Sequence, residues 1–282
     1  MEAGYDYLLL RGRFQRRLGR ITGIFLVVAG ILLLASAGAY YGYAAKVRST
    51  VTTLEVSVEL IPPTPINRHF VSPARVVPGF SPSTISETPL YPGDLVSVDS
   101  WISPLSYEPL YLRIQNELVG FKFLDPNEST LMGPYAPANR IMIPAIDIDS
   151  NVTELSILDL GNSRTYETPR NSVGHIPETA NAGESGGSWF FGHTEGLLSG
   201  EGSVFFTLQN VPKLLRNGES IYIITDNGSE RFLYQATETR VVHQDNMELT
   251  ESNGASIHLV SCVPRLVYDY RLIVTGELIG KQ

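Results

Sequence analysis

Cysteine is almost absent from this chain: its 282 residues include one, Cys262. A lone cysteine cannot form an intramolecular disulfide, and the Cys/His spacing of a zinc site is also missing. There is no glycine-rich loop of the kind that cradles a phosphate. The sequence therefore predicts no cofactor and no metal, although Asp147 and Asp149 leave a calcium site open.

Basic side chains are scarce beyond residue 20. The formal net charge of the whole chain is −8, and residues 21–282 carry 16 basic and 27 acidic side chains, a net of −11. A nucleic-acid-binding surface needs a basic patch, so the acidic body argues against nucleic acid as a partner.

Charge is absent altogether from residues 21–39, and the uncharged run continues to Ala45. Because a helix rises 1.5 Å per residue, about 20 apolar residues cross a hydrocarbon core of roughly 30 Å. Tyrosines fall at the far end of the run, where an interfacial aromatic belt belongs. We therefore expect a single transmembrane anchor over residues 21–45.

The charges on either side predict how the anchor is oriented. Five arginines precede it, within a basic tail at residues 1–20, and Lys46 and Arg48 follow it. The positive-inside rule then puts the tail in the cytoplasm and residues 46–282 outside the cell membrane. Ala35-Ser36-Ala37 resembles a signal-peptidase site, so cleavage remains an alternative, but the apolar run exceeds a typical signal-peptide core and favours a retained anchor.

Residues 46–138 read as a proline-rich linker or N-terminal extension. Val51 to Leu60 alternates apolar and polar residues like one strand, and Tyr111 to Phe123 fits a short helix followed by a strand. Between them, residues 61–92 are rich in proline, serine and threonine, which is typical of an extended arm. Such an arm either spaces the body from the bilayer or packs along it.

Short apolar segments separated by turn signals follow one another from Arg140 to the end of the chain. Asn227-Gly228 between two of them indicates a hairpin, and Phe205 to Leu215 is the one plausible helix, shortened by Pro212. This pattern predicts an all-β barrel or sandwich with short helices, over residues 139–282.

Cys262 lies at the end of one of these strands, because Ile257 to Val260 is a buried-strand pattern and Pro264 breaks the ladder. A lone cysteine is usually a small buried hydrophobe. Outside the membrane, however, an unpaired thiol is a liability unless it has a chemical role. The predicted compartment therefore favours Cys262 as a nucleophile.

A histidine beside a thiol can accept its proton and protonate a leaving amine. His193 is the strongest candidate because it follows the apolar strand pattern Trp189-Phe190-Phe191 and a glycine. His175 is a weaker candidate, and His258, on the same strand as Cys262, is a runner-up. Arg271 alternates with apolar neighbours on the next strand, and its charge could stabilise an oxyanion.

These residues resemble the sortase family. Phe191-Gly192-His193 is similar to the Gly-His motif of that family, Leu259-Val260-Ser261-Cys262 to its Thr-Leu-x-Thr-Cys motif, and Tyr270-Arg271-Leu272 to the strand that carries its arginine. Ile141-Met142-Ile143-Pro144 resembles the first barrel strand of the family. The resemblance covers about residues 139–279, and it departs from the pattern at Gly187-Ser188, where many relatives have Gly-Asn.

The resemblance implies a membrane-anchored cysteine transpeptidase with a closed β-barrel. Cys262 would cleave a C-terminal Leu-Pro-x-Thr-Gly sorting signal between Thr and Gly, His193 would transfer protons, and Arg271 would stabilise the oxyanion or position the substrate. The acceptor amine would come from a cell-wall precursor or a pilin. Two alternatives remain: another extracellular cysteine peptidase or L,D-transpeptidase, and a surface assembly module without catalysis.

Overall fold

The computed structural model describes residues 3–60, 110–124, 133–159, 164–166, 169–196, 202–252 and 254–282. The whole proline-rich segment at residues 61–92 therefore lies outside the described residues, as does part of the loop after His193.

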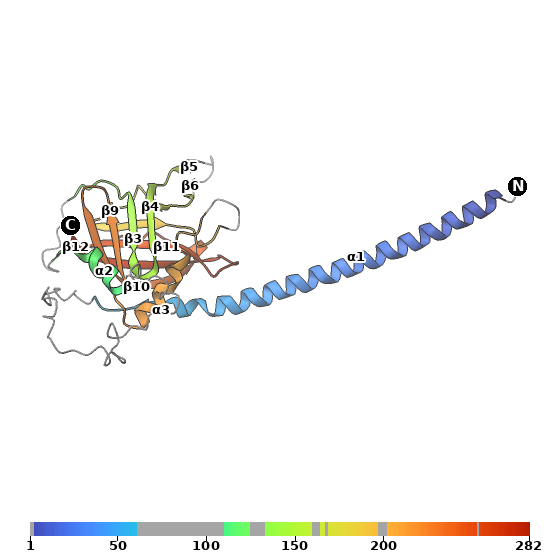
Figure 1. Cartoon of the computed structure of the whole chain (residues 1–282), viewed down its shortest axis with the longest axis horizontal. Coiled ribbons are helices and arrows are strands. Elements are labelled where there is room, and N and C mark those ends of the chain that lie inside the picture. The colour runs from blue at the N-terminus through green and yellow to red at the C-terminus, as the bar shows by residue number, and fades with distance from the viewer. Residues whose placement is uncertain are drawn as a thin grey trace, which may run out of the picture.

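Most helices and strands of the C-terminal half are short, as the sequence predicts, and two of its strands are long (Figure 1). The α-helices are α1 Ala3–Ser49, α2 Leu110–Leu118 and α3 Val211–Arg216. The 3₁₀ turns are η1 Val51–Leu54, η4 Pro144–Ile146, η5 Phe206–Asn210 and η6 Gln244–Asn246. The strands are β1 Val56–Ser57, β2 Lys122–Phe123, β3 Arg140–Ile143, β4 Ile148–Glu154, β5 Ile157–Asp159, β6 Arg164–Tyr166, β7 Val173–His175, β8 Gly186–Phe191, β9 Tyr222–Asp226, β10 Arg231–His243, β11 Ala255–Val263 and β12 Tyr270–Lys281.

Eight of these strands close into a barrel. They pair in the order β10, β9, β3, β4, β7, β8, β11, β12, and β12 pairs back onto β10. Two pairs in the ring are parallel, β4 with β7 and β8 with β11, and the others are antiparallel. Closure leaves no unpaired strand edge in the ring, and it confirms the predicted all-β barrel.

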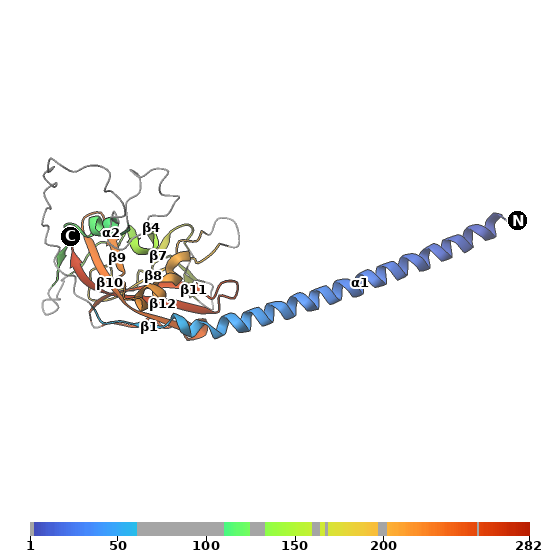
Figure 2. The same ribbon diagram turned by 60° about the horizontal axis from the view of Figure 1, so that its bottom comes forward.

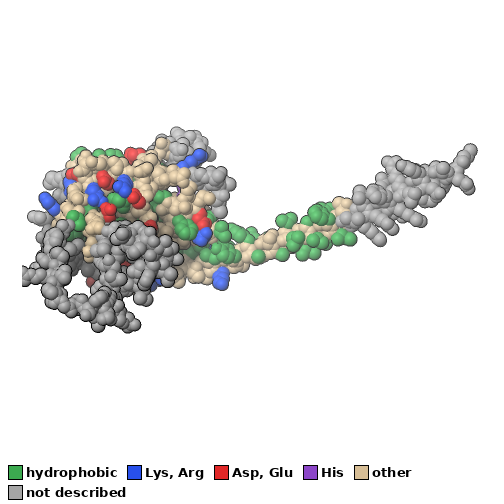
Figure 3. All heavy atoms as spheres, viewed as in Figure 1, with side chains coloured by type: hydrophobic (Ala, Val, Ile, Leu, Met, Phe, Trp, Pro, Cys, Tyr) green, Lys and Arg blue, Asp and Glu red, His purple; other side chains and the backbone are tan. Residues whose placement is uncertain are grey.

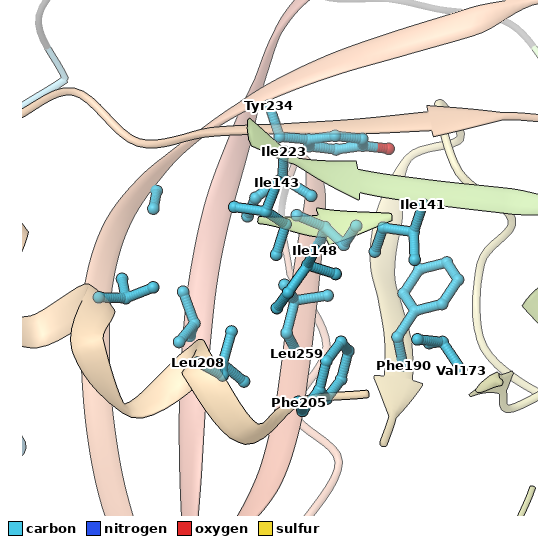
Figure 4. Close-up of a cluster of buried hydrophobic side chains, with 14 of the residues drawn as sticks. Ile141, Ile143, Ile148, Val173, Phe190, Phe205, Leu208, Ile223, Tyr234 and Leu259 are labelled. Atoms are coloured by element: carbon cyan, nitrogen blue, oxygen red, sulfur yellow. The ribbon is translucent and has the colours of Figure 1, made fainter. Parts of the chain in front are cut away.

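The barrel interior is filled by apolar side chains that alternate along its strands. Ile141 and Ile143 of β3, Phe190 of β8, Tyr234 of β10 and Leu259 of β11 are fully buried there (Figure 4). The hydroxyl of Tyr234 accepts a hydrogen bond of 2.7 Å from the backbone N–H of Gly183, so its polar end is satisfied inside the core.

Three segments differ from the pattern of the sequence. The helix expected over Phe205 to Leu215 forms as two pieces, η5 and α3. Pro212 lies in the first turn of α3, where proline is tolerated, so it does not end a helix. Val51 to Leu60 is a 3₁₀ turn followed by the two-residue strand β1 on β10. The sequence pattern predicts two separate strands at residues 231–236 and 239–242, but residues 231–243 form one long strand whose register shifts between Ala236 and Glu238.

Helix α1 leaves the barrel at one end and extends far from it (Figures 1 and 2). Its segment from Thr22 onward is the one stretch among the described residues that is long and apolar enough to cross a membrane. Hydrophobic side chains cover much of this part of the helix (Figure 3). The helix is thus consistent with the predicted anchor by length and composition.

Candidate active site

Three adjacent strands, β8, β11 and β12, present matched rows of side chains on the outer face of the barrel. His258 of β11 lies opposite Trp189 of β8 and Thr275 of β12. Two residues further along, Val260 lies opposite Phe191 and Ile273. The residues that precede them on β11, Ile257 and Leu259, point into the main core because side chains alternate along a strand.

Cys262 is the next outward position on β11, and Arg271 is its cross-strand partner on β12. Paired residues on antiparallel strands have Cα atoms about 4.5 to 5.5 Å apart and share a face. The thiol and the guanidinium therefore start from neighbouring backbone positions on the same side of the sheet.

His193 continues the row of Trp189 and Phe191 beyond the end of β8. The backbone N–H of Gly192 donates to the carbonyl of Val260 at 3.2 Å, and the hydroxyl of Thr194 donates to the carbonyl of Cys262 at 2.7 Å. These two bonds extend the β8–β11 register past the last paired residues. His193 lies between them, so its backbone runs beside that of Cys262, on the side opposite Arg271.

Gly192 allows this approach because the space beside it is occupied. A Cβ atom at Gly192 would lie 2.5 Å from the ring of Phe205, which is fully buried. Phe205 also donates its backbone N–H to the carbonyl of His193 at 2.9 Å. A side chain at position 192 would push this contact apart and displace the histidine.

Cys262 is half-buried and is the one free thiol of the chain. Burial raises the pKa of Cys262 above its ordinary value, and the positive charge of Arg271 opposes part of that rise. The thiol therefore keeps its proton near neutral pH. Nε2 of His193 is shielded from solvent and has no hydrogen-bond partner among the described residues, which leaves it available to a proton or a ligand.

The guanidinium of Arg271 is held by the loop that precedes it. Nη1 donates to the carbonyls of Tyr268 and Tyr270 at 2.8 and 3.1 Å, and Nη2 donates to the side-chain oxygen of Gln244 at 3.3 Å. Its partners are neutral oxygens, so no carboxylate neutralises it through these bonds, and its charge remains available to an anionic group.

The other candidate histidines already have partners. His258 is stacked on Trp189 at 4.3 Å between ring centroids, and its two ring nitrogens lie 3.1 Å from the hydroxyls of Ser256 and Thr275. Four residues of strand, about 13 Å, separate it from Cys262. His175 is buried, with its ring nitrogens 2.9 Å from Glu154 and 3.1 Å from the carbonyl of Ala180. Both arrangements are structural.

The site is surrounded by a polar network that the sequence does not indicate. Glu195 accepts a hydrogen bond of 2.6 Å from the hydroxyl of Tyr268 and forms an ion pair with Arg265, which lies 5.0 Å from the ring centroid of Phe206. The hydrogen bond from Arg265 and, to a smaller extent, the one from Tyr268 lower the pKa of the Glu195 carboxyl group. The loop position of Arg265 predicts a solvated side chain, whereas the structure pairs it with Glu195. Glu195 is two residues after His193 in the sequence, but a polar loop residue carries no signal of its partner.

An apolar surface adjoins the three residues on the outer face. Ile176, Trp189, Val260 and Ile273 are its buried members, and Phe191, Val242 and Met247 are partly exposed beside them.

A larger groove of about 920 Å³, lined by Arg140, Asp149 and Phe206 among others, does not include any of the three site residues. Within the described part of the chain there is no group of three or more His, Cys, Asp or Glu side chains that could hold a metal ion.

Together, these features define a closed β-barrel with a thiol, an imidazole and a guanidinium brought to one outer edge. The family model described as Sortase domain matches residues 141–279. No curated protein matches this chain. Residues 141–279 are therefore a sortase domain, and the family indicates a cysteine transpeptidase.

Solved structures of sortases are similar to part of the chain. Sortase C1 of Streptococcus agalactiae in complex with MTSET is 26% identical, with 50% of this chain and 67% of that chain covered and a TM-score of 0.38. Sortase A of Listeria monocytogenes is 16% identical (52% and 90% covered, TM-score 0.38), and sortase A of Corynebacterium diphtheriae is 22% identical (60% and 81% covered, TM-score 0.37). With TM-scores this low, the assignment rests on the family match.

Proposed function

We propose that this chain is a membrane-anchored transpeptidase that cleaves a C-terminal sorting signal of the Leu-Pro-x-Thr-Gly type and joins the cleaved protein to an amine. Cys262 is the nucleophile, His193 the proton carrier and Arg271 the oxyanion or substrate contact. The observation that supports the proposal is the register of β11 and β12, in which Cys262 pairs with Arg271, together with the hydrogen bond from Thr194, the residue after His193, to the carbonyl of Cys262.

In the first step the thiol proton of Cys262 passes to the imidazole of His193, and Sγ attacks the carbonyl carbon of the threonine. The charge that develops on the carbonyl oxygen is stabilised by the guanidinium of Arg271. The carbon–nitrogen bond then breaks, and His193 returns the proton to the departing glycine amine. A thioester between threonine and Cys262 remains.

In the second step an amine of the acceptor loses a proton to His193 and attacks the thioester carbon. The carbon–sulfur bond breaks, a new amide forms, and the sulfur regains the proton. Because the resting thiol is protonated and half-buried, this proton cycle through His193 needs no external base. The acceptor is an amine of a cell-wall precursor or of a pilin.

The apolar surface beside the site supports a peptide substrate of this type. Phe191, Val242 and Met247 are partly exposed, so they can contact the leucine and proline of an extended peptide. We also propose that α1 is the anchor, with residues 1–20 in the cytoplasm and the barrel outside the cell membrane, in reach of both the substrate protein and the acceptor.

The test uses the full chain in detergent micelles, incubated with Leu-Pro-x-Thr-Gly peptides that vary at x. We expect intact mass to gain the acyl fragment, and hydroxylamine to remove it, because a thioester is cleaved by that nucleophile. Cys262→Ala is expected to abolish the adduct. A wild-type chain that forms no adduct with any peptide, or a Cys262→Ala variant that still cleaves, would contradict the proposal.

A further inference from the structure

The loop from Pro264 to Asp269 separates the two strands of the site. It begins two residues after Cys262 and ends two residues before Arg271, so its shape fixes how both side chains are presented. Leu266 and Tyr268 adopt positive φ angles of 66° and 58°, a conformation that non-glycine residues rarely adopt without outside contacts. One such contact is the hydrogen bond from Tyr268 to Glu195 described above.

The last turns of α1 contact both ends of this loop. The hydroxyl of Tyr43 lies 3.5 Å from the carbonyl of Arg265, and Nε of Arg48 donates to Asp269 at 2.7 Å. Ala44, between them on the helix, is buried although it belongs to a helix whose preceding turns are exposed. The helix end is therefore packed against the barrel and is not a free tether.

The contact at Asp269 is close to the guanidinium of the site. Asp269 has a side chain that is 16% exposed, and its second oxygen, Oδ1, is buried without a hydrogen-bond partner among the described residues. The preceding residue, Tyr268, is the one whose carbonyl accepts the 2.8 Å hydrogen bond from Arg271. The carbonyl of Asp269 itself accepts from the backbone N–H of Gln244, whose side chain also contacts Arg271.

We propose that the end of α1 is part of the active-site architecture and that Arg48 is a positioning residue: through Asp269 it holds the loop in the conformation that orients Arg271 toward the thiol. The anchor then does more than localise the enzyme, because the segment that leaves the membrane also braces the site. This inference rests on the proposed function for its kinetic consequence.

The physical reason for the effect is that, among the described residues, the Asp269 carboxylate has no side-chain partner other than Arg48. A mostly buried carboxylate that loses its cation keeps the cost of desolvation, so the loop is expected to rearrange until water reaches Asp269. Such a rearrangement moves the carbonyl of Tyr268 and releases one of the hydrogen bonds of Arg271. Since Arg48 itself is 47% exposed, the ion pair is partly screened and its loss should be moderate.

The experiment compares Arg48→Asp, Asp269→Arg and the double variant Arg48→Asp/Asp269→Arg in the full chain in micelles. Each single variant is expected to lower kcat for peptide cleavage about three- to tenfold with a smaller change in KM, and the charge-swapped double variant to recover most of the loss. Lys46→Asp is the matched control, because it reverses a charge in the same helical turn without touching Asp269, and we expect kcat to stay at the wild-type value.

Alkylation of Cys262 with iodoacetamide separates this inference from the proposed function. It needs no peptide, and Cys262 is the one thiol of the chain. We expect the alkylation rate at fixed pH to fall in each single variant and to return in the double variant, even if no sorting peptide is cleaved by the wild type. Single variants with wild-type alkylation rates, or a double variant no better than either single one, would overturn the inference, whereas failure of the wild type to cleave any peptide would overturn the proposed function alone.

Discussion

The outer face of β8, β11 and β12 carries two histidine sites that are built from the same strands but have opposite properties. The structural site consists of Trp189, His258 and Thr275, and the candidate active site consists of His193, Cys262 and Arg271. In the structural site the imidazole is stacked and both of its nitrogens have hydroxyl partners. Burial, aided by the charge of Arg240, lowers the pKa of His258 to about 4.

In the candidate active site the complementary groups are left open. Nε2 of His193 has no partner among the described residues, and Cys262 is half-buried. The charge of Arg271 is held by neutral oxygens. Strand position alone therefore does not distinguish a structural histidine from a candidate catalytic one. What distinguishes them is whether the protein has already satisfied the ring nitrogens.

Loss of the imidazole is expected to have a different consequence in each of the two sites. His193→Ala is expected to lower kcat/KM for peptide cleavage by about 10² to 10⁴, because general acid–base transfer is lost, with little change in the melting temperature. His258→Gln is expected to leave kcat/KM within about threefold of wild type while it lowers the melting temperature through lost stacking on Trp189.

Cleavage of a fluorogenic sorting peptide and thermal unfolding of the same full-length samples measure both quantities. The two sites would not be functionally distinct if His258→Gln abolished cleavage at a temperature where the barrel remains folded. A His193→Ala variant with wild-type kcat/KM would remove His193 from the mechanism.

Much of this comparison follows from the sequence. Alternating apolar residues, Pro264 and the position of Cys262 predict a strand that ends near the thiol, and the structure has β11 ending at Val263. The hairpin at Asn227-Gly228 also forms, between β9 and β10, with Gly228 at a φ of 90°. These features are local, so nearby residues determine them.

What the sequence could not predict depends on contacts between distant segments. His258 lies within one strand pattern and His193 follows another, and only the pairing with Trp189 and Thr275 shows that His258 is satisfied. The hydrogen bond from Thr194 to Cys262 spans 68 residues, and the ion pair from Arg48 to Asp269 spans 221. No period or local motif encodes such partners, and the roles of the three site residues stay a prediction.

In each site the charge of an arginine acts on the pKa of a titratable side chain. Burial raises the pKa of Cys262 and the charge of Arg271 offsets part of that rise, whereas burial lowers the pKa of His258 and the charge of Arg240 lowers it further. Arg271→Gln is therefore expected to shift the iodoacetamide alkylation profile of Cys262 to higher pH. Arg240→Gln, the matched control, should leave that profile in place. Equal shifts in both variants would mean that the effect is general charge loss and not the local pairing of Cys262 with Arg271.

The two sites also differ in how they affect stability in mild acid, and this effect arises in the structural site. His258 takes up a proton in the unfolded chain near its ordinary pKa of 6.5 but in the folded chain only near 4, so the unfolded state binds more protons in between. The free energy of unfolding should then fall as the pH falls from 6.5 toward 4, by about 3 kcal/mol at most from this residue. Thermal unfolding of the full chain across this window should show a steeper loss for wild type than for His258→Gln. Parallel curves for wild type and His258→Gln would show that His258 is protonated at its ordinary pKa, and the distinction between a closed and an open imidazole would lose its physical basis.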